Sequence, residues 1–264
     1  MGRPTVALLT DFGTRDHYAG TLKGVVLSVC PDATLVDIAH DIPAHDVMAG
    51  ALELAACYRY FPHGTIFLVV VDPGVGSARR GMAADIGDYK FVAPDNGVLS
   101  AVFAESPPKK VVELTERKYA RPTVSRTFEG RDRFAPAAGF LAKGVALVSL
   151  GKSLAHYQTL DLPRPAIEDG VLLGQVLRVD HFGNLITNID RKTFDHFAAG
   201  GAIAVEISGQ EVPRVVATYA EAQPGALCAL FGSTDHLEIA LNAGDAAAAL
   251  QLGRGAAARV RIVR

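Results

Sequence analysis

The strongest constraint on the fold of this 264-residue chain is a change of pattern that begins at residue 161. Before that point, short apolar runs alternate with helix-like segments, which is typical of an α/β domain. After it, short β-like stretches are separated by Gly, Asn and Asp, which favours a small barrel or sandwich. Two prolines lie among the charges of 161–169 (DLPRPAIED) and disfavour both a helix and a central strand, so an interdomain linker is predicted there.

The sequence therefore predicts an α/β N-terminal domain over 1–162, with a central, mostly parallel sheet, and an all-β, barrel-like C-terminal domain over 163–264. The run 65–71 (TIFLVVV) predicts a fully buried strand. In the first domain, further strands are expected at 6–9, 34–38, 82–86 and 89–93, and helices at 19–29, from the N-cap Asp46 to about residue 58, and at 134–143. In the second, strands are expected at 171–179, 202–207, 212–216, 226–231, 237–241 and 260–263.

Composition excludes several classes of protein. Hydrophobic residues make up 49% of the chain and charged residues 20%, which is too apolar for a disordered protein. With 26 basic against 28 acidic residues, no overall attraction to nucleic acid or to a membrane surface is expected. The apolar runs are far shorter than the roughly 20 residues that span a bilayer. Because Asp11 interrupts the first run before it could form a signal-peptide core, a cytoplasmic protein is expected.

Cysteine and histidine spacing argues against a metal site. Cys30, Cys57 and Cys228 form neither a disulfide framework nor a metal-binding pair, and they are expected to be inert packing residues. No H-E-x-x-H occurs, so no metal is expected. A dinucleotide fingerprint, a P-loop and the G-x-S-x-G of a serine hydrolase are likewise missing from the sequence.

Two polar segments directly follow predicted strands, where an α/β sheet forms its ligand crevice. In 10–18 (TDFGTRDHY), Asp11 and Asp16 are placed to hold a ribose or an amine, although Asp11 would serve equally as a turn cap. In 72–80 (DPGVGSARR), Asp72 and Arg79 can form an oriented ion pair inside a cleft, or the segment is a plain structural turn.

Two further segments carry candidate residues. Glu129 lies in 127–136 (TFEGRDRFAP), a charge cluster that is either a site or a solvated helix start. In 180–188 (DHFGNLITN), an Asp, an Asn and an aromatic residue lie between two predicted strands and are suited to reading a purine edge and stacking on its face.

Taken together, these segments resemble the S-adenosyl-L-methionine hydroxide adenosyltransferase family, the S-adenosylmethionine hydrolases related to the fluorinase and chlorinase. The resemblance is carried, in the family order and over nearly the whole chain, by LLTDFGTRDHYAGTLKGV (8–25), VDPGVGSARR (71–80), APDNGVLS (93–100), TFEGRDRFAP (127–136), DHFGNLITNI (180–189) and LEIALNAG (237–244).

The resemblance implies hydrolysis of S-adenosylmethionine to adenosine and methionine, without a cofactor. It also implies a homotrimer whose sites lie between the N-terminal domain of one subunit and the C-terminal domain of the next. Asp72, Arg79 and Glu129 match the catalytic positions. Asp11 would hold the ribose hydroxyls, and Asp180 and Ser233 would lie near the methionine amine and carboxylate. Asp16, Tyr18 and Phe182 would also bind the substrate. The adenine would be surrounded by Asn184, Ser233, Glu238, Leu241 and Asn242.

The chain departs from the family pattern at Glu129, where the family's TFHGRD has a histidine. Asp, Arg and a neutral His sum to zero charge, whereas Asp, Arg and Glu sum to −1 unless a proton is shared. Two alternatives therefore stay open: a halogenase that forms a 5′-halo-5′-deoxyadenosine, and a non-catalytic binder of adenosine or S-adenosylmethionine. Whether His45 contacts a ligand or only packs also stays open.

Overall fold

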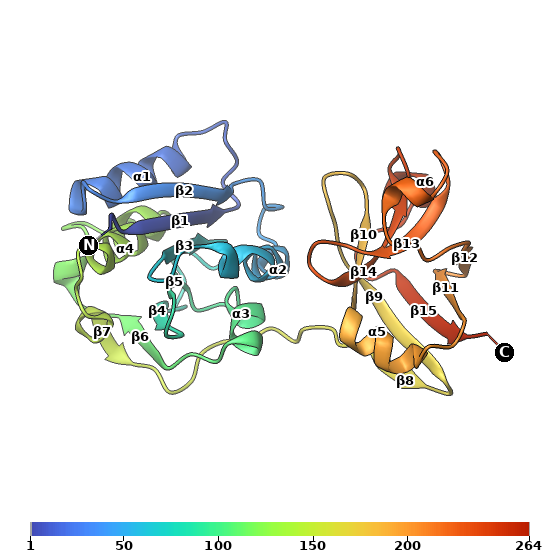
Figure 1. The fold of residues 1–264 in the computed structure, drawn as a ribbon. Coiled ribbons are helices and arrows are strands. Elements are labelled where there is room, and N and C mark those ends of the chain that lie inside the picture. Colours follow the sequence, from blue (N-terminus) through green and yellow to red (C-terminus); the bar gives the residue numbers. More distant parts are fainter. Residues whose placement is uncertain (1, 264) are drawn as a thin grey trace. The chain divides into compact units, whose positions relative to one another are not determined.

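The computed structural model describes residues 2–263, which form two compact units. The N-terminal unit ends at Asp161 and the C-terminal unit begins at Leu162. Figure 1 colours the first from blue to yellow-green and the second from yellow to red. No helix in the described part of the chain is long and apolar enough to cross a membrane.

The N-terminal unit is built around one seven-stranded sheet, with strand order β2-β1-β3-β5-β4-β6-β7. Its strands are β1 (Thr5–Thr10), β2 (Thr34–Ala39), β3 (Ile66–Val70), β4 (Gly81–Asp85), β5 (Lys90–Pro94), β6 (Lys110–Leu114) and β7 (Gly151–Ser153). Its α-helices are α1 (Tyr18–Val29), α2 (Val47–Cys57), α3 (Ser100–Glu105) and α4 (Ala135–Ala142), with short 3₁₀ helices at Tyr58–Tyr60, Arg117–Tyr119 and Leu147–Leu150 and a π-helix at Gly130–Phe134.

The sheet is mixed, which corrects the prediction of a mostly parallel one. The pairs β1–β2, β1–β3 and β3–β5 are parallel, whereas β4–β5, β4–β6 and β6–β7 are antiparallel. The physical reason lies in the connection from β4 to β5, because only four residues separate these strands. Parallel neighbours need a crossover of a dozen or more residues, so such a short turn makes a hairpin.

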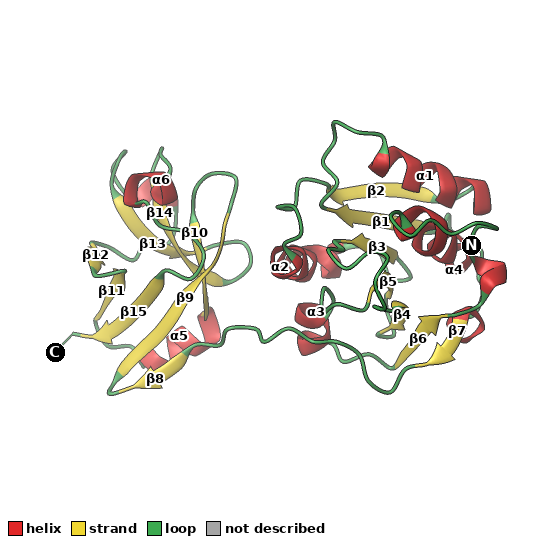
Figure 2. Ribbon diagram, turned by 180° about the vertical axis from the view of Figure 1, so that it is seen from behind, coloured by secondary structure: helices red, strands yellow, loops and turns green. Residues whose placement is uncertain are grey.

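The buried side chains of this unit explain why its strands and helices form where they do. Every residue of β3 is buried, as predicted for the run 65–71. Helices α1 and α4 pack on each other and on one face of the sheet, where Leu22, Phe134 and Leu141 meet the side chains of alternate strand residues such as Leu8 and Leu68. Figure 2 shows these helices against the strands of the sheet.

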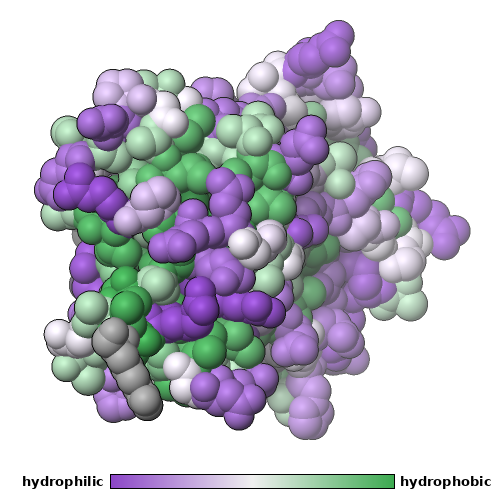
Figure 3. Space-filling model, turned by 90° about the vertical axis from the view of Figure 1, so that its right-hand side faces the viewer, coloured by the Kyte–Doolittle hydropathy of each residue, from purple (hydrophilic) through white to green (hydrophobic). Residues whose placement is uncertain are grey.

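The C-terminal unit is mainly β-structure. Its strands are β8 (Ala166–Glu168), β9 (Val171–Val179), β10 (Leu185–Asp190), β11 (Ile203–Ile207), β12 (Gln210–Val212), β13 (Leu227–Phe231), β14 (His236–Leu241) and β15 (Ala257–Ile262). They form an antiparallel sheet in the order β12-β11-β15-β9-β10-β14-β13, with β8 added to β9. Figure 3 shows hydrophobic and hydrophilic residues interspersed on one face of the molecule.

The first and last strands of this sheet approach each other, so the sheet is nearly closed into a barrel. Val215, which follows β12, forms an isolated bridge with Ala229 in β13. Two hydrogen bonds of 2.9 Å accompany this bridge, from Val216 N to the Ala229 carbonyl and from Ala229 N to the Arg214 carbonyl. The barrel-like C-terminal fold is therefore confirmed.

The sequence predictions for this unit were wrong about one strand and missed β10 and two helices. The expected strand at 212–216 is only the end of β12 followed by the Val215 bridge. Asp180, Phe182 and Asn184 do lie between two strands, but the second of these, β10, was not predicted. The unit also holds α5 (Arg191–Ala198) and α6 (Ala246–Leu250), whose capping aspartates accept hydrogen bonds from main-chain N–H groups inside each helix.

Candidate functional site

Asp72, Arg79 and Glu129 form one buried cluster of charges where β3 ends. Arg79 donates from Nε to Asp72 Oδ1 at 2.8 Å and from Nη2 to Asp72 Oδ2. The same Nη2 lies 2.5 Å from Glu129 Oε2. The exposed fractions of these side chains are only 4% for Asp72, 9% for Arg79 and 13% for Glu129. The structure therefore brings together the three residues that the sequence singled out as catalytic.

Hydrogen bonds within the loop 72–80 determine its shape. Ser77 Oγ donates to the Gly74 carbonyl at 2.6 Å and accepts from Arg79 N at 3.2 Å, which turns the chain back toward Asp72. Gly76 has a φ of +78°, and a Cβ there would lie 2.2 Å from the Arg126 carbonyl oxygen. Only glycine fits position 76, because the backbone there is left-handed and lies in close contact with the segment that leads to Glu129.

Glu129 is positioned by an unusual helix start. It directly precedes the π-helix Gly130–Phe134, which continues into α4. The wider π turn is uncommon and occurs frequently at functional sites. Within this turn Asp132 is fully buried and accepts from Ser125 N at 2.9 Å and from Arg131 Nε at 2.7 Å. Asp132 thus fixes the segment structurally, whereas Glu129 faces Arg79.

Burial dominates the electrostatics of the cluster. It raises the pKa of Asp72, because a carboxylate loses hydration when it is enclosed. The hydrogen bonds and charge of Arg79 oppose that shift, and the nearby Glu129 adds to it. The guanidinium of Arg79 also lies over the ring of Phe134, 5.1 Å from its centroid. Two buried carboxylates around one guanidinium can orient a small polar molecule and accept a proton from it.

The two carboxylates face a cavity of about 220 Å³. Asp11, at the end of β1, lines the same cavity, and its Oδ2 accepts from His45 N at 2.8 Å. The cavity is lined by Asp11, Phe12, Ala44, His45, Val70, Asp72, Val75, Thr127, Phe128, Glu129 and Gly130. His45 therefore forms part of the cavity wall and donates a main-chain hydrogen bond to Asp11.

Asp16 and Tyr18 do not line this cavity. Asp16 is exposed, and Tyr18 is 39% exposed. The Tyr18 ring packs on Phe12 and Phe128, with ring centroids 5.7 Å and 5.2 Å away. Tyr18 thus packs on two aromatic residues of the wall, and the structure does not bring Asp16 to the cavity.

Sequence reasoning missed a buried support for the Asp11 loop. His40 is 6% exposed, and its Nδ1 lies 2.8 Å from Thr10 Oγ1, while its Nε2 lies 3.0 Å from Asp37 Oδ1. The His40 carbonyl accepts from Gly13 N at 2.7 Å. These contacts hold both ends of the turn that carries Asp11.

The C-terminal unit has its own groove of about 800 Å³. All seven substrate-binding residues that the sequence predicted in this unit line it. The lining is Arg178, Asp180, Phe182, Asn184, Ile186, Ala217, Thr218, Tyr219, Leu230, Phe231, Gly232, Ser233, Thr234, Glu238, Leu241, Asn242, Ala243 and Gly244.

A tight turn sets the polar end of this groove. Asp180 Oδ1 accepts from Phe182 N and Asn184 N, both at 2.9 Å, and Asp180 Oδ2 accepts from Asn184 Nδ2 at 2.9 Å. The turn leaves the Phe182 side chain 72% exposed. An exposed aromatic ring beside a fixed amide and carboxylate can stack on a planar ligand and hydrogen-bond to its edge.

One of the residues that line the groove is a buried acid. Glu238 on β14 is 4% exposed and accepts a hydrogen bond from the Tyr219 hydroxyl. Burial raises the pKa of Glu238, the Tyr219 hydrogen bond lowers it, and the charge of Asp180 raises it further. Burial and the same carboxylate raise the pKa of Tyr219. Tyr219 was missed in the sequence because 19 residues separate it from its partner.

The motif 93–100 is structural. Asp95 is 3% exposed and accepts from Arg80 Nε at 2.9 Å and from Gln158 N at 2.7 Å. Asn96 Nδ2 donates to the Val71 carbonyl at 2.8 Å. These bonds tie the end of β3 to neighbouring loops. Among residues 2–263, no group of three or more His, Cys, Asp and Glu side chains is arranged to hold a metal ion.

Comparison with known proteins gives a match to two family models. Residues 6–151 match the SAM hydroxide adenosyltransferase N-terminal domain, and residues 174–259 match the C-terminal domain of the same name. The two matched segments fall one in each unit of the structure.

Individual relatives span nearly the whole chain. An "(R)-S-adenosyl-L-methionine hydrolase" of Thermus thermophilus is 38% identical, over 97% of this chain and 98% of its own length. A "fluorinase" of Nocardia brasiliensis is 30% identical, over 98% and 97%. The crystal structure of an uncharacterized conserved protein from Thermotoga maritima has a TM-score of 0.92 at 34% identity, covering 97% of this chain and 99% of that one.

Proposed function

The chain belongs to the SAM hydroxide adenosyltransferase family, and from that premise we propose that it hydrolyses S-adenosyl-L-methionine to adenosine and L-methionine. Three "(R)-S-adenosyl-L-methionine hydrolases", at 35% to 38% identity over 97% of this chain, support the proposal. The observation that carries it is the cluster of Asp72, Arg79 and Glu129 at the wall of a cavity that also contains Asp11.

The reaction requires the protein mainly to position the reacting groups. Water attacks ribose C5′, a C–O bond forms as the C5′–S bond breaks, and the sulfonium leaves with the electron pair as a neutral thioether. No general acid is required, so the site must align the water and accept its proton. We assign water orientation to Asp72, which is held by Arg79, and either Asp72 or Glu129 takes the proton.

We assign the substrate contacts as follows. Asp11 holds the ribose hydroxyls, and Asp180 and Ser233 lie near the methionine amine and carboxylate. Phe182 stacks on the purine. The remaining adenine contacts are assigned to Asn184, Glu238, Leu241 and Asn242. The support for these roles is that Asp11 lines the cavity of the N-terminal unit and the others line the groove of the C-terminal unit.

We propose further that the enzyme is a cytoplasmic homotrimer that needs no cofactor. Each complete site would combine the cavity of one subunit's N-terminal unit with the groove of the next subunit's C-terminal unit. The support is that each unit carries part of the predicted binding set. Sedimentation of the purified protein tests the trimer, with a monomer at working concentration as the contrary result.

A halogenase is the second candidate, favoured by the likeness to fluorinases. Electrostatics disfavour it. At about 4 Å, a halide and a carboxylate repel by roughly 4 kcal/mol at an effective dielectric constant near 20, before halide desolvation is counted. Asp72 is buried, so solvent does little to weaken that repulsion. Chloride-dependent formation of 5′-chloro-5′-deoxyadenosine would decide for this reaction.

The decisive experiment is incubation with S-adenosylmethionine in oxygen-18 water, followed by mass spectrometry of the nucleoside. We expect one labelled oxygen in adenosine, because the new C–O bond takes its oxygen from water. Tight binding with intact substrate would instead support a non-catalytic binder. An Asp72→Asn sample run in parallel controls for spontaneous breakdown of the substrate.

A further inference from the structure

Arg133 approaches the Glu129 oxygen that Arg79 does not contact. Its Nη2 lies 3.7 Å from Glu129 Oε1, whereas Arg79 Nη2 lies 2.5 Å from Glu129 Oε2. The spacing follows from the local helix, because Arg133 is four residues after Glu129 in the same turn. The Glu129 carboxylate is therefore held between two guanidinium groups, one at each oxygen.

This contact changes the charge balance of the site. Asp72 and Glu129 carry two negative charges when ionised, and Arg79 alone leaves a net charge of −1. With Arg133 counted, the cluster is neutral. Neutrality matters here because two carboxylates around one cation retain a proton more readily, and a protonated carboxyl group cannot accept one from water.

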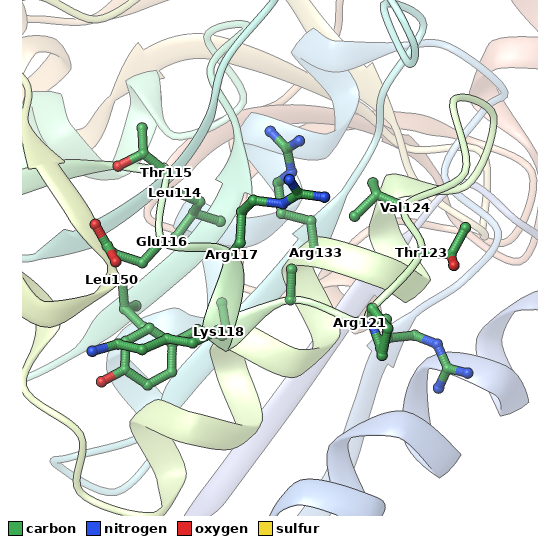
Figure 4. Close-up of a pocket in the computed structure, with 14 residues that line it drawn as sticks. Leu114, Thr115, Glu116, Arg117, Lys118, Arg121, Thr123, Val124, Arg133 and Leu150 are labelled. Atoms are coloured by element: carbon green, nitrogen blue, oxygen red, sulfur yellow. The ribbon is translucent and has the colours of Figure 1, made fainter.

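Arg133 also lines a second cavity, of about 760 Å³. Figure 4 shows Arg133 and Arg117 extending into that cavity, which Lys118 and Arg121 also line. The Arg133 side chain is 33% exposed, so water partly screens its charge. Repulsion from the neighbouring cations of this cavity favours the placement of Arg133 beside a carboxylate.

We propose that Arg133 is a positioning residue for the hydrolysis reaction, one that neutralises Glu129 and holds its carboxylate toward Arg79. The inference rests on the proposed function and deepens it. It assigns to Arg133 the task of allowing glutamate to serve where the family pattern has histidine.

The test compares Arg133→Met and Arg133→Lys in two backgrounds, the natural chain and Glu129→His. Adenosine formation gives kcat and KM, and circular dichroism checks folding. In the natural background we expect Arg133→Met to lower kcat about fivefold with KM changed less than about twofold, and Arg133→Lys to recover most of the loss. In the Glu129→His background, where no carboxylate needs neutralising, Arg133→Met should change kcat by less than about twofold.

The pH dependence of kcat gives a readout that packing alone would not move. Glu129 is faced by Arg79 and Arg133, and Asp72, Asp11 and His45 line the same cavity. We expect Arg133→Met to shift the acid side of the profile upward by roughly half a pH unit. Arg117→Met is the matched control, because it removes a cation from the same second cavity, and it should leave the profile in place.

Each result decides the inference. An unchanged kcat and pH profile in Arg133→Met, or an equal loss in both backgrounds, would overturn it while leaving hydrolysis intact. If Glu129→His is inactive, the pH profiles of the natural background decide alone. If the natural protein forms no labelled adenosine, the proposed function fails first and the role of Arg133 falls with it.

Discussion

Arg79 binds Asp72 through two parallel hydrogen bonds, from Nε to Oδ1 and from Nη2 to Oδ2. This bidentate arrangement fixes both the position and the plane of the carboxylate, and lysine could not reproduce it. Because both side chains are nearly fully buried, removing Arg79 leaves Asp72 as an uncompensated buried charge, whereas removing Asp72 leaves Arg79 paired with Glu129 alone.

Asp72→Asn and Arg79→Ala should each lose most turnover, by about a hundredfold or more, while adenosine still binds. Adenosine formation and calorimetric titration with adenosine measure the two properties. Arg59→Ala is the matched control, since Arg59 forms an exposed ion pair with Glu105 at 3.1 Å and should be neutral. Normal turnover in both site variants would refute the assignment.

Glu129→His should keep or raise the turnover of the natural protein. A neutral imidazole restores the residue of the family pattern and removes one buried negative charge next to Asp72. Steady-state rates of adenosine formation measure the effect. A folded variant that binds adenosine but has no activity would mean that the geometry around position 129 differs between this protein and its relatives.

Turnover should rise with pH, with a midpoint above the ordinary aspartate pKa of 3.8, because the buried Asp72 must be ionised to act. Burial raises the pKa of Asp72 against the opposing effect of Arg79, and Glu129 contributes to the rise. Glu129→Gln should therefore move the midpoint to lower pH. A midpoint at or below 3.8 in the natural protein would contradict this account.

Glu238 should make the folded protein less stable as pH rises above its ordinary pKa of 4.5. Burial raises the pKa of Glu238, so the folded protein keeps a proton that the unfolded chain has released, and stability falls until the raised pKa is passed. The urea midpoint should fall less steeply with rising pH in Glu238→Gln than in the natural protein. It should fall more steeply in Tyr219→Phe, because the hydrogen bond from Tyr219 lowers the pKa of Glu238 and its removal lets that pKa rise. Identical slopes in all three proteins would exclude this effect.

Gly76→Ala should reduce both stability and turnover. Its Cβ would meet the Arg126 carbonyl and push apart the segments that carry Arg79 and Glu129. Gly144→Ala is a matched control, because Gly144 also has a positive φ, of +89°, but an added Cβ has nothing within 4 Å. The control should lose only about 1 kcal/mol and keep its activity. Equal effects of the two substitutions would remove the steric argument.

Local patterns predicted much of the fold. The largely apolar run at 65–71 predicted the buried central strand, and Asp46 does cap α2 by accepting from Ala49 N. The direction of pairing is not a local property, but the short connection between the expected strands at 82–86 and 89–93 already required a hairpin. The π-helix before α4 has no comparable signal, since its sequence also suits an ordinary helix start.

The site was predictable in its residues but not in its pairings. The charges between Glu129 and Arg133 stand close together in the sequence, and several pairings are possible. The fold pairs Asp132 with Arg131 and Arg121 and turns Glu129 toward Arg79. Contacts between distant segments, such as Tyr219 with Glu238, depend on strand register and therefore could not be read from spacing alone.

The bridge between Val215 and Ala229 makes the groove easier to open at the segment 217–219 than at the paired strands β13 and β14. The segment 217–219 lines the groove directly after this bridge, which has two hydrogen bonds, whereas β13 and β14 are paired along five residues. Local unfolding proceeds first where few bonds must break. Release of this segment, which must also break the Tyr219–Glu238 hydrogen bond, can therefore widen the groove while the rest of the barrel stays paired, and the amide hydrogen of Val216 should exchange with solvent sooner than those within β14.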